Sequence, residues 1–330
     1  MDARSLTAMS DRGWTDLGGG LRVRQSVAFQ MNSTLLLDGE DSVLVDPGVL
    51  PAEIDDIARV VEGIDPENVT LLFTHAHWDH VLARPWWPDA ETLAHDRFIT
   101  EVRRDAARIV NEAENLCRSH SESWGRGFTP FAPDHAVSGL HFTRLGPWRL
   151  VLRDAPGHST SQITVHLPDH ATLIAADMLS DIEIPLLDGP CAPYRRTLAD
   201  LMPLVQGGAI RTLIPGHGTI ARGTEAALER LTRDQSYLER LEAAVQKARR
   251  DRLSRDQAVE KLADMEYAGA PLTASNQASH LENIGFAFDG TASAPAAESR
   301  GAKGRPSPEA RRRPEARRSP EARRRPARKP

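Results

Sequence analysis

Cysteine is scarce in this 330-residue chain, which has only Cys117 and Cys191, far apart and outside any CxxC pattern. We therefore expect no disulfide framework. Long apolar runs are also missing, since none approaches the ~18 residues of a membrane-spanning helix. Residues 1–16 carry charges throughout and lack the apolar core of an export signal. These absences predict a cytoplasmic protein without a membrane partner.

The charge is spread unevenly along the chain. The net charge is −5, but residues 300–330 hold 13 Lys or Arg and three Glu, a balance of +10, so the preceding residues carry −5 − 10 = −15. A six-residue unit that begins Pro-Glu-Ala-Arg recurs at Pro308, Pro314 and Pro320. Such a segment cannot bury a core. We therefore predict a folded domain over residues 1–288, with a C-terminal helical part at 224–288, and a disordered Pro/Arg-rich tail at 289–330.

Two interpretations of the basic tail remain open. We favour a solvated segment without a partner, because no aromatic residue is interleaved for stacking on bases. The alternative is a basic arm that contacts nucleic acid or another polyanion. Nothing in the sequence specifies an oligomeric state.

Histidine is concentrated in one place. His75, His77 and His80 put three of the chain's 12 histidines within six residues, with Asp79 among them. The apolar run Val69–Phe73 leads into this stretch and is typical of a buried strand that ends in a loop. Neutral imidazoles and a carboxylate suit zinc, iron and other divalent metals. The stretch therefore predicts part of a metal site.

Three further apolar runs are each followed by one potential ligand. These runs precede His158, Asp177 and His217, and they are Trp148–Leu152, Ala171–Ala176 and Ile210–Ile214. Open α/β sheets place their ligands at the carboxyl ends of the strands. We therefore expect five histidines and two aspartates to meet on one rim.

The ordered set His-x-His-x-Asp-His, His, Asp, His resembles the metallo-β-lactamase fold superfamily from about Leu35 to about Gly218. The resemblance implies an α/β four-layer αβ/βα sandwich, here with added C-terminal helices. It also implies two divalent metal ions, for which we expect zinc, with iron or manganese as alternatives. By resemblance, His75, His77 and His158 hold the first ion, Asp79, His80 and His217 hold the second, and Asp177 bridges them.

The presence of both His80 and Asp177 separates the chain from zinc β-lactamases, which replace a residue of the first motif or the bridging aspartate. The pattern is closer to the glyoxalase II and lactonase-like branches. It implies a dinuclear hydrolase in which a metal-bound hydroxide attacks a small ester, thioester or lactone, with Asp79 passing a proton to the leaving group. A phosphodiesterase or nuclease, and a mononuclear iron enzyme like the persulfide dioxygenases, are the alternatives.

Four further expectations concern single residues or segments of the domain. Asp46 either supports a ligand histidine or caps the next helix. The loop-like stretch 121–137 is a candidate roof over the site. Alternation predicts a strand at 21–29 after an irregular start, and an apolar stripe predicts a helix over 94–120.

Deleting residues 290–330 should leave both the melting temperature and the turnover of small acyl substrates unchanged, because this segment cannot pack. Thermal unfolding and initial rates of the full-length and truncated proteins provide the measurement. A clear fall in melting temperature on truncation would mean that the basic tail docks on the acidic domain.

Overall fold

The computed structural model describes residues 13–290, which contain two β-sheets. The first sheet has seven strands that follow one another in chain order. Strands β1 to β4 pair antiparallel, and β4 to β7 pair parallel. The strands are β1 (Trp14–Gly18), β2 (Leu21–Gln25), β3 (Asn32–Leu37), β4 (Asp41–Val45), β5 (Asn68–Leu72), β6 (Glu91–His95) and β7 (His135–Val137).

The second sheet has six strands in the order β13-β12-β11-β10-β9-β8. Neighbouring strands pair antiparallel except β11 and β12, which are parallel. Its strands are β8 (Leu140–Leu145), β9 (Trp148–Asp154), β10 (Ile163–Leu167), β11 (Thr172–Ile174), β12 (Thr212–Ile214) and β13 (Ala221–Arg222). Strands β8 and β9 form a hairpin that turns at Gly146 and Pro147.

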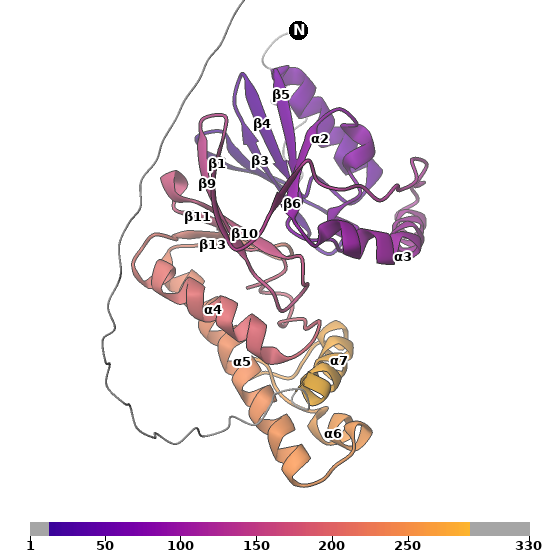
Figure 1. Ribbon diagram of the computed structural model, residues 1–330, viewed down its shortest axis with the longest axis vertical. Helices are drawn as coiled ribbons and strands as arrows, with labels where there is room; N and C mark the ends of the chain where they lie inside the picture. The colour runs from indigo at the N-terminus through magenta and orange to yellow at the C-terminus, as the bar shows by residue number, and fades with distance from the viewer. Residues whose placement is uncertain (1–12, 291–330) are drawn as a thin grey trace, which may run out of the picture. The chain divides into compact units, whose positions relative to one another are not determined.

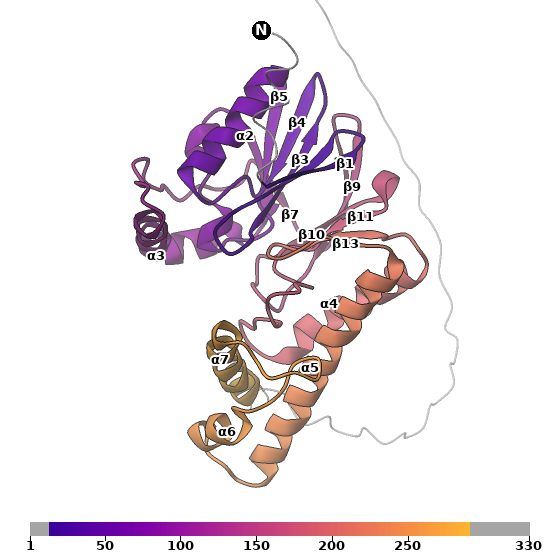
Figure 2. The ribbon, with the colours of Figure 1, turned by 180° about the vertical axis from the view of Figure 1, so that it is seen from behind.

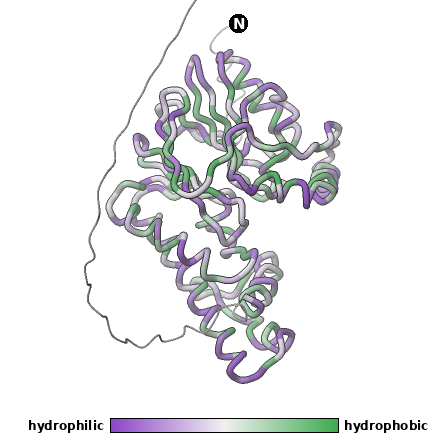
Figure 3. The backbone as a smooth tube through the Cα atoms, viewed as in Figure 1, coloured by the Kyte–Doolittle hydropathy of each residue, from purple (hydrophilic) through white to green (hydrophobic). Residues whose placement is uncertain are grey.

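Within residues 13–290, six α-helices cover the two sheets and extend beyond them (Figures 1 and 2). They are α2 (Pro51–Ile64), α3 (Phe98–Ser119), α4 (Cys191–Gln206), α5 (Thr224–Arg250), α6 (Arg255–Leu262) and α7 (Ala274–Gly290). In Figure 3 the helices alternate between hydrophilic and hydrophobic colours, as expected of elements that bury only one face. No helix within residues 13–290 is long and apolar enough to cross a membrane.

Three apolar clusters separate four layers. Residues of both sheets share the central cluster, for example Leu36 of β3 and Leu152 of β9. A second cluster joins the first sheet to α2 and α3, and a third joins the second sheet to α4 and α5. The layers therefore run helices, sheet, sheet, helices, and the predicted αβ/βα sandwich with C-terminal helices is confirmed.

Two local predictions were wrong. The strand expected at 21–29 ends at Gln25, because Phe29 and Gln30 adopt positive φ angles of 56° and 50°, and β1 precedes it in the stretch expected to be irregular. The helix expected over 94–120 begins only at Phe98. The first residues of the predicted helix instead belong to the five-residue strand β6, which pairs with β5 and β7.

Helix α7 lies at the end of the described chain and ends at Gly290, two residues beyond the predicted domain boundary. The remainder of the predicted tail lies outside the described residues.

The Asn283 side chain of α7 holds the segment before α4. Its amide nitrogen donates to the Pro185 carbonyl at 2.7 Å, and its oxygen accepts from the Leu187 backbone at 2.8 Å.

Asp234 is a buried carboxyl group on α5, where it accepts a hydrogen bond from the Tyr267 hydroxyl. Burial raises its pKa to about 7, against the opposing effects of that hydrogen bond and of Arg233. A carboxyl group whose pKa is raised by folding binds an extra proton in the folded state. Its stabilising contribution is therefore complete below the unfolded pKa and is lost as the pH rises toward 7.

We expect Asp234→Asn, which mimics the neutral acid, to remove this part of the pH dependence of stability. The melting temperature of the variant relative to wild type should be higher at pH 8 than at pH 5. Asp264→Asn, at an exposed position of the same helical region, is the matched control. An Asp234→Asn curve that runs parallel to wild type across this range would show that Asp234 is ionised in the folded protein.

Candidate metal centre

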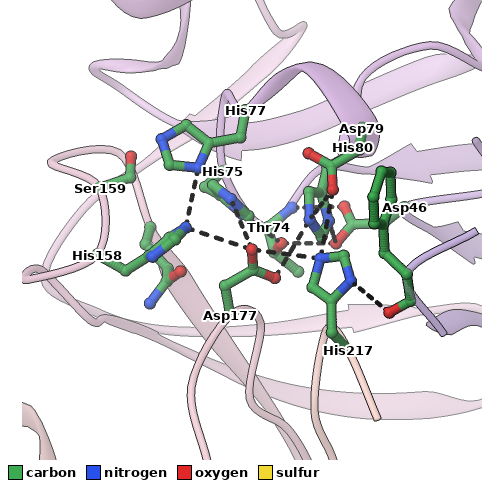
Figure 4. Close-up of polar contacts among 12 residues, drawn as sticks. Asp46, Thr74, His75, His77, Asp79, His80, His158, Ser159, Asp177 and His217 are labelled. Atoms are coloured by element: carbon green, nitrogen blue, oxygen red, sulfur yellow. Dashed lines mark hydrogen bonds and ion pairs between the residues drawn. The ribbon is translucent and has the colours of Figure 1, made fainter. Parts of the chain in front are cut away.

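Ends of strands in both sheets deliver the seven predicted side chains to one place (Figure 4). His75 and His77 lie just after β5, and the short 3₁₀ helix η1 (Trp78–His80) supplies Asp79 and His80. The other three residues, His158, Asp177 and His217, follow β9, β11 and β12. Ligand atoms of His75, His77, His158 and Asp177 lie within 4.8 Å of one another, as do those of Asp79, His80 and His217.

The Asp177 carboxylate lies between these two groups. Its Oδ2 atom is 3.3 Å from His158 Nε2, 3.6 Å from His75 Nε2 and 3.5 Å from His217 Nε2. Its Oδ1 atom is 3.2 Å from His80 Nε2. One carboxylate therefore contacts histidines that come from both groups.

Close approach of Asp177 requires the glycine at position 216. A Cβ atom there would lie 2.0 Å from Asp177 Oδ1, which is far inside van der Waals contact. The carbonyl of Gly216 also accepts a hydrogen bond from the Asn32 backbone at 2.7 Å, which ties the His217 loop to the start of β3. Gly216 in the Pro-Gly-His sequence therefore leaves room for the Asp177 carboxylate as well as forming part of the turn before His217.

Buried polar atoms without a hydrogen bond test whether these residues suit a metal. His75 Nε2, His80 Nε2 and Asp177 Oδ1 are buried and form no hydrogen bond within the described chain. Buried polar atoms are usually satisfied, and an ion is one of the recognised explanations when they are not. The unsatisfied atoms belong to the two groups described above, so the donor set fits divalent metal ions.

The electrostatics of the cluster also fit cations. Burial lowers the pKa of His75 well below its ordinary range and that of His77 to about 3, so both imidazoles are neutral and able to bind metal. Burial would also lower the pKa of His80, but Asp177, Asp79 and Asp46 outweigh it and raise that pKa. The negative charge of Asp46, Asp79 and Asp177 therefore favours cations in the cluster.

Asp46 supports the site and does not cap a helix. Its Oδ2 atom is 2.9 Å from His80 Nδ1, and its two oxygens accept hydrogen bonds from the Thr74 backbone and hydroxyl at 2.8 and 2.6 Å. No side chain caps α2, whose N-cap residue is Leu50. Asp46 thus fixes the His80 ring with Nε2 directed toward Asp177, which decides between the two interpretations of this residue.

Glu101 of α3 contacts the residues that follow His158, and the sequence did not reveal it. Its buried carboxylate accepts hydrogen bonds from the Ser159 and Ser161 hydroxyls, both at 2.8 Å, and from the Thr160 hydroxyl. These three residues directly follow His158. The run of three hydroxyl residues was the only signal, and its partner lies 58 residues earlier in the chain.

A cleft of about 450 Å³ opens onto the cluster. Besides His77, Asp79, His158, Asp177 and His217, it is lined by residues of α3, of the segment before α4 and of α7, together with Phe29 and Trp78. The loop 121–137, expected to roof the site, contributes no lining residue. The C-terminal helical region supplies that wall instead.

Comparisons with known proteins found similar sequences and structures. The model of the metallo-beta-lactamase superfamily matches residues 27–236. A probable metallo-hydrolase, YqgX of Bacillus subtilis, is 25% identical over 159 residues, covering 46% of this chain and 67% of that protein. The acyl-coenzyme A thioesterase MBLAC2 of Gallus gallus is 23% identical over 203 residues, covering 56% of this chain and 72% of that protein.

Two solved structures share the fold. A beta-lactamase domain protein from Burkholderia ambifaria has a TM-score of 0.56 at 16% identity and covers 87% of this chain and 92% of its own. The stereoselective inverting sec-alkylsulfatase Pisa1 from Pseudomonas has a TM-score of 0.62 at 14% identity. That match covers 84% of this chain but only 50% of the alkylsulfatase.

Glu101→Gln should weaken metal binding, because an amide cannot accept hydrogen bonds at both of its terminal atoms as the carboxylate does. Loss of such an orienting partner typically lowers metal affinity by ~10- to 100-fold. Zinc affinity, measured by competition with a chelator, provides the test, and Glu114→Gln at an exposed position of α3 is the control. Wild-type affinity in Glu101→Gln would refute a role for Glu101 in positioning His158.

Proposed function

Because the chain belongs to the metallo-beta-lactamase superfamily of hydrolytic enzymes, we propose that it is a dinuclear zinc hydrolase of esters, thioesters or lactones. One observation carries this proposal: the Asp177 carboxylate lies within 3.6 Å of histidine nitrogens from both ligand groups. A carboxylate with two oxygens so placed suits two metal ions better than one.

The donor set supports a specific assignment. His75, His77 and His158 would hold the first ion, Asp79, His80 and His217 would hold the second, and Asp177 would contact both. Imidazole nitrogens with few carboxylates favour zinc among the divalent metals. When bound, such ions polarise a carbonyl and lower the pKa of water toward neutrality.

The protein's own contribution to proton transfer is assigned to Asp79. Its Oδ2 atom lies 3.3 Å from His217 Nε2 and 3.7 Å from His80 Nε2, and the residue lines the cleft. Burial would raise the pKa of Asp79, but His80 and His217 outweigh it and lower the pKa to about 2. Asp79 is therefore ionised, and its position in the cleft beside His80 and His217 is the reason for assigning it to take a proton from the attacking water and pass it to the leaving oxygen or sulfur.

Two observations favour an acyl substrate over a phosphodiester. The similarity to an acyl-coenzyme A thioesterase extends over 56% of this chain. The cleft also contains the apolar side chains Phe29, Trp78 and Phe286 beside the ligand cluster. We further propose that residues 1–288 form the catalytic unit and that 289–330 are dispensable for small substrates, since α7 still supplies cleft residues near its end.

A panel of chromogenic substrates tests the proposed reaction. Nitrophenyl esters, a thioester, a lactone and bis(nitrophenyl) phosphate should be compared with zinc-loaded protein. We expect kcat/KM, corrected for the uncatalysed rate, to be highest for acyl substrates. Faster cleavage of the phosphodiester would replace this proposal with a phosphodiesterase.

Asp79→Asn tests the proposed proton transfer. The amide keeps the shape and one coordinating oxygen but removes the base, so kcat should fall by ~10²–10⁴. The loss should be smaller for leaving groups that need no proton, such as nitrophenolate, than for alkoxides. Metal content, measured in parallel, separates loss of the base from loss of an ion. Asp89→Asn, exposed and outside the cleft, is the matched control.

Equal losses of kcat for good and poor leaving groups, with the full metal content retained, would contradict the role of Asp79 as proton donor.

A further inference from the structure

Apolar side chains that face solvent form part of the cleft wall. Phe29 and Phe286 are 52% and 37% exposed, and they are two of the five large hydrophobic residues that the described chain exposes most. Both line the cleft, and the Phe29 ring meets Trp78 edge-to-face at a centroid distance of 6.1 Å. Exposed apolar side chains gathered in a functional cleft indicate an apolar portion of the ligand.

The backbone holds Phe29 in this exposed position. Phe29 and Gln30 both have positive φ angles, at 56° and 50°. Non-glycine residues keep such angles only where the surroundings impose them, and they are concentrated at functional sites. The Phe29 carbonyl lies 3.1 Å from His217 Nδ1, and the Ser26 backbone donates to the Met31 carbonyl at 2.7 Å across the loop. The Phe29 end of the cleft is therefore adjacent to His217.

The opposite end carries cationic side chains. Arg104 and Arg108 of α3 line the cleft, with side chains 61% and 52% exposed. Asp105 contacts both guanidinium groups, at 2.8 Å to Arg104 and 3.5 Å to Arg108. Arg104 and Arg108 lie about one and two helical turns after Glu101, whose carboxylate accepts hydrogen bonds from the three hydroxyl residues that follow His158, so these arginines lie on the His158 side of the cleft.

One carboxylate cannot use all the donors of two guanidinium groups, each of which has five N–H bonds. Arg108 forms no hydrogen bond with the described residues beyond its ion pair with Asp105. The cleft also contains Glu183, Asp188 and Glu282, but these come from the segment before α4 and from α7. Their charge would direct an anionic group toward the α3 wall.

The ligand cluster lies between the two ends. In Figure 4, His77 and His158 occupy one side of Asp177 and His217 the other. The Phe29 carbonyl contacts His217, whereas the arginines follow Glu101, which holds the residues after His158. A substrate that spans the cleft would thus place its middle over the cluster.

We propose that the substrate is an amphiphilic acyl ester or thioester, with its apolar acyl chain against Phe29, Trp78 and Phe286 and an anionic leaving group at Arg104 and Arg108. This inference rests on the acyl hydrolase function proposed above. Hydrolysis breaks the acyl C–O or C–S bond, forms a C–OH bond with oxygen from water and transfers one proton to the leaving oxygen or sulfur.

Four thioesters test both ends of the cleft in one experiment. Acetyl and octanoyl groups are each joined to N-acetylcysteamine, which is neutral, and to mercaptoethanesulfonate, which is anionic. Rates are divided by those of hydroxide-catalysed hydrolysis, so that differences in leaving-group reactivity cancel. For wild type we expect kcat/KM to rise by ~10-fold from acetyl to octanoyl and by ~10-fold from the neutral to the anionic thiol.

Variants assign each preference to its end. Phe286→Ala should reduce the octanoyl-to-acetyl ratio, with Phe142→Ala, exposed on β8, as control. The double variant Arg104→Gln/Arg108→Gln should reduce the anionic-to-neutral ratio, with Arg103→Gln, exposed on α3 outside the cleft, as control. Each variant should leave the other ratio as in wild type.

A wild-type enzyme that hydrolyses the thioesters but lacks either preference overturns this inference and leaves the acyl hydrolase function standing. Preferences that persist in the cleft variants also overturn it. No thioester hydrolysis by zinc-loaded protein, with cleavage of bis(nitrophenyl) phosphate, instead overturns the proposed function itself.

Discussion

A buried carboxylate among four imidazoles is the constraint on which the rest of this structure depends. Asp177 lies within 3.6 Å of His75, His80, His158 and His217, which follow strands of both sheets. An isolated buried charge is strongly unfavourable, so the fold must supply compensating groups. Strand ends from the two halves of the sandwich therefore have to meet at one rim, and the tie between Asn32 and the His217 loop holds them there.

The groups around the ligands explain why their side chains keep their orientation. Asp46 contacts the His80 ring, the Phe29 carbonyl contacts the His217 ring, and Glu101 fixes the three hydroxyl residues after His158. Such partners set ring orientation and basicity in metal sites. Phe29 has two structural roles, because its carbonyl contacts His217 while its ring forms part of the cleft wall.

Sequence reasoning succeeded where the signal was local. All seven proposed ligands meet because each follows an apolar run that ends at the rim. It failed where distant segments meet. Glu101 acts on residues 58 to 60 positions away, and the cleft walls combine Phe29, α3 and α7. Sequence periodicity carries no information about contacts between distant segments. Strands β1 and β6, with five residues each, are also too short to show a clear alternating pattern.

The metal content of fully loaded protein tests most directly whether Asp177 joins two ions. Elemental analysis of zinc-saturated, gel-filtered wild type should give about two zinc ions per chain, as the two ligand groups require. Asp177→Ala should retain its secondary structure by circular dichroism and lose at least one of them. A single ion in saturated wild type, or two ions in a folded Asp177→Ala protein, would contradict the bridging role of Asp177.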